Sequence, residues 1–94
     1  MEHLVMSKYG ENFMSIITFD NLFNNIKNDI SFKEKLIINL DGVNNISPSF
    51  MTRLINKLII ELDFQKIEIE NANKRLETTF KFALNSIRQK EMIN

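Results

Sequence analysis

The pattern that most constrains the fold of this chain is a strand signal that passes almost directly into a helix signal. Residues 35–41 read Lys-Leu-Ile-Ile-Asn-Leu-Asp, a short apolar run typical of a central strand covered on both faces. After the break at Gly42, Ser47 and Pro48 suit the cap and the first position of a helix. Helical spacing of apolar residues then continues to about Asp63. A buried strand followed by an amphipathic helix predicts an α/β fold.

The remaining segments repeat this alternation of strand and helix. An apolar stripe from Phe19 to Ile30 predicts a first helix, and the strictly alternating Lys66–Glu70 predicts a half-exposed strand. A last helix is expected at about 73–92. At the start of the chain we expect a strand at 3–8 and a short return strand at 13–17.

The chain is expected to form a single domain over residues 1–94. Its length suffices for one hydrophobic core, and no linker or low-complexity stretch divides it. The predicted order of elements is β(β)-α-β-α-β-α, with a mixed or parallel sheet, helices packed on it and right-handed crossovers.

The composition argues against several classes of partner. Twelve basic and twelve acidic residues cancel, so no overall field attracts nucleic acid. We expect no membrane interaction, because neither a signal peptide nor an apolar run of spanning length occurs. A cytoplasmic protein is the simplest expectation.

The sequence also lacks the groups of residues that carry most enzyme chemistry. There is no cysteine, a single histidine (His3), and no phosphate-binding glycine loop or nucleophile elbow. Asp41 ends a strand, but no further carboxylates stand near it in the sequence to hold a metal ion. We therefore expect no enzymatic activity, no cofactor and no metal site.

The junction at Asp41, Ser47 and Ser49 is the best candidate for a binding site. Two hydroxyl groups at the positive end of a helix favour a bound or covalent phosphate. The plainer alternative is that Ser47 and Ser49 only serve the start of the helix, while Asp41 bonds to N–H groups of its own turn.

Three stretches of the chain resemble the STAS-like family of unknown function, small bacterial domains related to sulfate-transporter and anti-sigma-factor-antagonist domains. The resemblance rests on Leu40–Val43 with Ile46–Phe50, on Asn71–Asn73 with the helix that follows, and on Gly10–Ser15. It implies a small STAS-like α/β domain. In anti-sigma-factor antagonists a phosphorylatable Ser or Thr begins this helix, and Ser49 is the matching position here.

The resulting hypothesis is a non-enzymatic regulatory module that binds a protein partner through residues 47–50. The resemblance implies a kinase-type ATPase or another signalling protein as that partner. Further candidates for the partner surface are apolar residues that fall outside the core stripes, together with a neighbouring cation; they are Arg53, Ile60, Phe64 and Phe82. The alternatives are a small anion or nucleotide sensor at the start of the second helix, or a structural homodimer.

Overall fold

The computed structural model describes residues 2–31 and 34–93, with side chains as far as Ile87. Its main sheet has three strands in the order β1-β3-β5: β1 (Glu2–Val5), β3 (Lys35–Asn39) and β5 (Lys66–Glu70). Both strand pairs are parallel, with Leu4 opposite Ile38 and Leu36 opposite Ile67. The prediction of a central strand after residue 34 is confirmed, although β3 ends at Asn39.

A second, two-stranded sheet closes one end of the domain. It pairs β2 (Asn12–Phe13) with β4 (Asn45–Ile46), again in parallel. The expected return strand at 13–17 is therefore wrong, because only Phe13 of that segment pairs, and it pairs with β4. The first strand is also shorter than expected, since the chain turns into a 3-10 helix, η1 (Met6–Lys8), directly after Val5.

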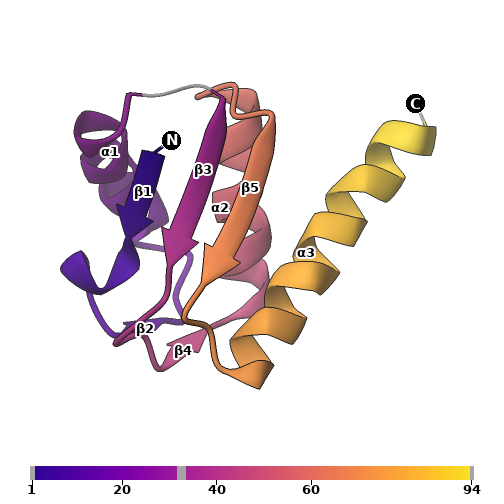
Figure 1. Ribbon diagram of the computed structural model, residues 1–94. Coiled ribbons are helices and arrows are strands. Elements are labelled where there is room, and N and C mark those ends of the chain that lie inside the picture. The colour runs from indigo at the N-terminus through magenta and orange to yellow at the C-terminus, as the bar shows by residue number, and fades with distance from the viewer. Residues whose placement is uncertain (1, 32–33, 94) are drawn as a thin grey trace.

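Three α-helices in the described part of the chain complete the fold: α1 (Phe19–Asp29), α2 (Pro48–Ile60) and α3 (Lys74–Ile93). In Figure 1, α2 passes behind the sheet, α1 flanks β1, and α3 stands beside β5. The molecule is thus a small α/β domain built on parallel strand pairs, as predicted. No helix in the described ranges combines the length and the apolar character needed to cross a bilayer.

Only one face of the main sheet is well covered. Leu36 and Ile38 of β3 are buried, whereas Ile37 between them is partly exposed. The expectation that β3 is covered on both faces is wrong, because its residues alternate between buried and partly exposed. The helices α1, α2 and α3 all contribute buried residues to the one core cluster. The other face carries ion pairs instead: Lys35 Nζ lies 3.2 Å from Glu68 Oε1, and His3 Nδ1 lies 3.4 Å from Glu70 Oε1.

Aromatic side chains join the small sheet to the helices. The ring of Phe50 in α2 lies 5.4 Å from Phe13 of β2 and 5.2 Å from Phe19 of α1, centroid to centroid. Phe19 in turn stacks on Phe23 at 5.6 Å. Because Phe50 is the third residue of α2, this cluster fixes where the helix begins.

We expect Phe50→Ala to lower the free energy of unfolding by about 3–5 kcal/mol, since it removes a buried ring and leaves a cavity. Urea unfolding followed by circular dichroism measures the change. Phe82→Ala is the matched control, because Phe82 is exposed and its truncation should change stability by less than about 0.5 kcal/mol. Equal losses in the two variants would contradict the role assigned to the cluster.

Candidate functional site

The start of α2 is built by its own capping residues. Ser47 Oγ accepts a hydrogen bond from the Phe50 N–H at 3.1 Å, and Pro48 occupies the first helical turn. The Ser47 side chain is therefore used in the cap, as the plainer alternative expected. Ser49 is exposed and takes no part in this bond.

Asp41 does not join Ser47 and Ser49 in one site. No hydrogen bond or ion pair within the described ranges links Asp41 to either serine. The turn after β3 is organised by Asn39, whose Oδ1 accepts bonds from the Asp41 N–H at 3.0 Å and from Asn71 Nδ2 at 3.1 Å. The side-chain-to-backbone turn expected of Asp41 is thus made by Asn39.

Gly42 allows this turn to approach the start of the chain. Its φ of +83° lies in the left-handed region, and a Cβ there would lie 3.3 Å from Ser7 Cβ. The close approach keeps the β3–β4 connection against η1 and leaves Asp41 exposed to solvent.

The most exposed apolar segment lies in the connection between β2 and α1. Met14, Ile16 and Ile17 expose 60%, 44% and 90% of their surface. Sequence reasoning missed this segment because it treated residues 13–17 as a strand. The one signal in the sequence was that the apolar residues of 13–17, two pairs separated by Ser15, do not alternate with polar residues as a half-buried strand requires.

Ile16 and the exposed side of α2 line the same hollow, of about 590 Å³. The residues that α2 contributes are Pro48, Ser49, Thr52, Arg53, Asn56 and Lys57. The Arg53 guanidinium lies 5.8 Å from the centre of the Phe19 ring, a cation–π distance that holds it near the start of α1. We call Met14, Ile16, Ile17, Ser49 and Arg53 the loop–helix surface.

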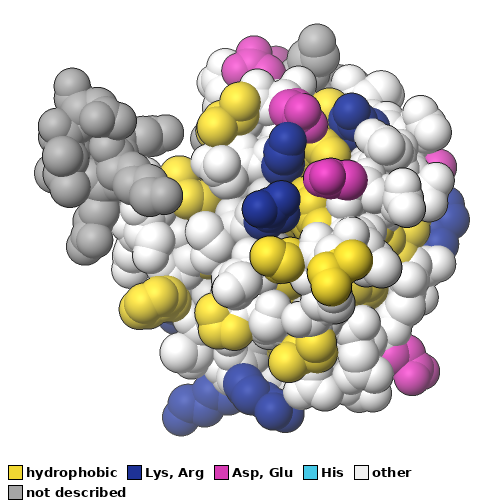
Figure 2. All heavy atoms as spheres, turned by 180° about the vertical axis from the view of Figure 1, so that it is seen from behind, with side chains coloured by type: hydrophobic (Ala, Val, Ile, Leu, Met, Phe, Trp, Pro, Cys, Tyr) yellow, Lys and Arg dark blue, Asp and Glu magenta, His cyan; other side chains and the backbone are white. Residues whose placement is uncertain are grey.

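Two of the other partner-surface candidates are exposed and one is not. Ile60 and Phe82 expose 70% and 68% of their surface, on different helices. Figure 2, which views the molecule from the side of α2, shows apolar side chains reaching the surface between charged ones. Phe64, at 2% exposure, belongs to the core, and its assignment to a partner surface is wrong.

The burial of Phe64 has a local cause at the end of α2. Asp63 adopts a left-handed φ of 61°, and the Phe64 N–H donates back to the Leu58 carbonyl at 3.2 Å. This bond returns the chain to the last turns of α2, and the left-handed residue before it turns Phe64 back onto the core. The apolar spacing of the sequence did not predict this turn, because the residue with the left-handed φ is an aspartate rather than a glycine.

A polar contact beside the loop–helix surface involves the single tyrosine. Tyr9 Oη donates a hydrogen bond to Asp29 Oδ2 at the end of α1, and Lys8 Nζ lies 3.6 Å from the same oxygen. Burial and this bond raise the pKa of Tyr9 to about 12, while the bond from Tyr9 lowers the pKa of Asp29. The contact ties the turn before β2 to α1.

Among the described residues, no three carboxylate or imidazole groups lie close enough together to hold a metal ion.

We expect Ser47→Ala to destabilise the protein by about 1 kcal/mol, because the Phe50 N–H loses its cap. Ser49→Ala should stay within about 0.5 kcal/mol of the parent chain, since Ser49 is exposed. Urea denaturation of both variants makes the comparison. A larger loss for Ser49→Ala would show that the two serines have been assigned the wrong roles.

The tyrosinate absorbance of the folded protein should titrate with a midpoint near pH 12 rather than at the ordinary pKa of 10.0. Because the folded-state pKa is raised, the Tyr9 contribution to stability is complete below pH 10.0 and is lost as the pH rises through about 12. Asp29→Asn should move the midpoint toward 10.0. Since Tyr9 is the only tyrosine, the signal reports this residue alone, and an unchanged midpoint in the variant would argue against the bond as a cause.

Protein-family models, curated protein sequences and solved structures give no significant match. The resemblance to the STAS-like family therefore stays a prediction.

Proposed function

We propose that this protein is a non-enzymatic STAS-like regulatory module that binds a protein partner through the loop–helix surface. The observation that carries the proposal is the exposure of Met14, Ile16 and Ile17 on one short connection. Exposed apolar side chains that stand together mark interaction surfaces more often than scattered ones do. Of the three, Ile16 lines the hollow that also contains Ser49 and Arg53, and Met14 lines a neighbouring hollow with Phe13 and Thr18.

The same geometry favours a protein partner over a small anion. In the first turn of α2, Pro48 has no N–H, and the Phe50 N–H is bonded to Ser47 Oγ. The Met51 N–H donates to the Ser47 carbonyl at 2.9 Å. Within the described ranges this leaves the Ser49 N–H as the donor of that turn for an incoming anion. A phosphate bound at a helix start normally takes several such donors.

Ser49 and Arg53 give the surface a means of regulation. They are four residues apart on α2, so their side chains project from the same side of the helix. A phosphate on Ser49 would bring about two negative charges beside the Arg53 guanidinium and add strong acceptor oxygens to an apolar surface. This supports the analogy with phosphorylated antagonists, whose partners are kinase-type ATPases and other signalling proteins.

We expect a photoreactive amino acid at position 17, introduced into the full chain in its source organism, to form an adduct with a specific protein. The same label at Glu61, an exposed residue outside the loop–helix surface, is the matched control. The partner identified by mass spectrometry is then purified and titrated with the parent chain and with Ile17→Asp. The affinity of the variant for the partner should fall at least about tenfold, because a charge replaces an apolar side chain that is buried in the complex.

Two results would count against this function. One is an adduct of equal yield from positions 17 and 61, and the other is unchanged affinity of Ile17→Asp for the purified partner. Ile17 is 90% exposed, so its substitution is not expected to disturb folding.

A further inference from the structure

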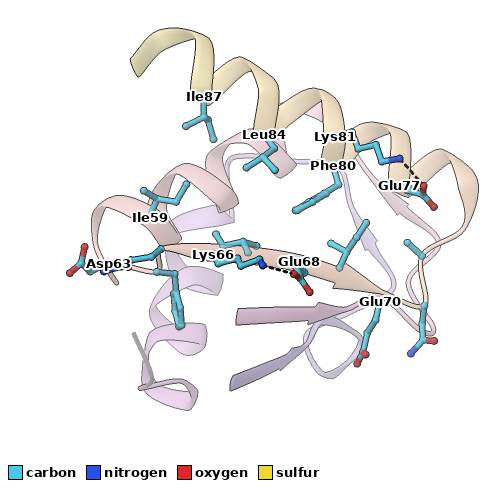
Figure 3. Close-up of a pocket in the computed structure, with 16 residues that line it drawn as sticks. Ile59, Asp63, Lys66, Glu68, Glu70, Glu77, Phe80, Lys81, Leu84 and Ile87 are labelled. Carbon is cyan, nitrogen blue, oxygen red and sulfur yellow. Dashed lines mark hydrogen bonds and ion pairs between the residues drawn. The ribbon is translucent and has the colours of Figure 1, made fainter. Parts of the chain in front are cut away.

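A groove runs between strand β5 and helix α3, and its lining residues are distinct from those of the loop–helix surface. It encloses about 970 Å³. Figure 3 shows Phe80, Leu84 and Ile87 projecting from α3 toward β5, with Ile59 of α2 closing one end. One wall of the groove is thus an apolar helix face, and the other is a strand.

The strand wall offers backbone hydrogen-bonding groups. Among the described strands, β5 ends the main sheet, whose order is β1-β3-β5. The Lys66 N–H bonds toward β3, to the Glu34 carbonyl at 3.2 Å, and the Glu70 carbonyl accepts the Leu40 N–H at 3.0 Å. Backbone groups alternate in direction along a strand, so the N–H and C=O groups of Ile67 and Ile69 point into the groove.

Backbone groups of this kind select an extended polypeptide. A strand laid beside β5 would take up the ladder bonds of Ile67 and Ile69 and turn every second side chain toward α3. Those side chains would meet Phe80 and Leu84, so apolar residues suit them. A small apolar ligand would fill the same volume but leave the backbone groups of the strand unbonded.

The charges around the groove indicate which residues should alternate with the apolar ones. Its lining carries four carboxylates and two amines: Asp63, Glu68, Glu70 and Glu77, with Lys66 and Lys81. Both amines already contact lining carboxylates, since Lys66 Nζ lies 3.5 Å from Glu68 Oε2 and Lys81 Nζ lies 3.0 Å from Glu77 Oε1. Lys35, outside the lining, also lies 3.2 Å from Glu68, so the four carboxylates face three amines. The remaining excess of one carboxylate favours lysine or arginine in the occupant.

We propose that this groove binds an extended segment of a partner protein, added as a fourth strand beside β5. The segment alternates apolar residues, which pack against α3, with basic residues, which face the carboxylates. A second copy of the chain is a poorer occupant. Its own β5 would add two glutamates against one lysine to a groove that is already acidic.

The test begins with a library of random peptides, displayed on phage and selected against the full chain. Selected peptides should show an alternating apolar and basic pattern. Adding one of them should slow hydrogen exchange of the Ile67 and Ile69 amides at least about tenfold, because those amides gain ladder bonds. The same peptide with its alternate amides N-methylated should not bind, since the ladder cannot form.

Variants of the protein separate this groove from other surfaces. Leu84→Asp should weaken the peptide at least about tenfold, whereas Phe82→Asp, two residues away on α3 but outside the groove lining, should not. Ile17→Asp should bind the peptide like the parent chain. Loss of partner binding at the loop–helix surface can therefore be distinguished from loss of peptide binding in the groove.

Several outcomes would overturn the proposal. The first is that the selected peptides are not enriched on the parent chain over the Leu84→Asp variant, and the second is that the N-methylated peptide binds equally well. The third is that a bound peptide slows hydrogen exchange of amides outside β5. The fourth is that exchange of the Ile67 and Ile69 amides slows with protein concentration alone. The last result would assign the groove to a second copy.

Discussion

Strand β3 bonds to β1 along one edge and to β5 along the other, and the remaining elements take their places from it. Leu36 and Ile38 turn toward the helices and are fully buried, so α1 and α2 pack on that side. The carboxyl end of β3 leads through the Gly42 turn to β4 and the cap of α2. Any shift of β3 by one residue would expose its buried pair and displace the start of α2.

Much of this architecture follows from local patterns in the sequence. The apolar stripe of α1, the Ser-Pro start of α2 and the alternation in β5 each predicted the element that the structure contains. The predictions that failed concern elements whose structure depends on segments distant in the sequence. The two-residue strands β2 and β4 exist only because they meet each other, and neither has a propensity that stands out alone.

The candidate site shows the same division between local and distant effects. Ser47 could be assigned to the cap from its neighbours, and Ile60 and Phe82 to the surface from their spacing. The burial of Phe64 follows from one left-handed residue, which the sequence does not signal when that residue is an aspartate. The exposure of the connection before α1 could not be predicted locally. It depends on the strand ending at Phe13, where the chain pairs with the distant strand β4.

One residue links the groove to the hollow that adjoins the loop–helix surface. Ile87 of α3 lines both the groove beside β5 and the hollow next to Ser49. Because its side chain packs between α2 and α3, a displacement of α3 that widens one hollow also alters the other.

The parallel pairing of the strands also bears on how the chain reaches its native state. Each strand pair joins segments roughly thirty or more residues apart, and within residues 2–31 and 34–93 no hairpin brings neighbouring strands together. No part of either sheet can form before long loops have closed, so stable sheet structure requires most of the chain at once. Fragments ending before β5 would leave β3 with β1 as its one neighbour and with the other edge unbonded. A nascent chain is exposed in that form until β5 emerges.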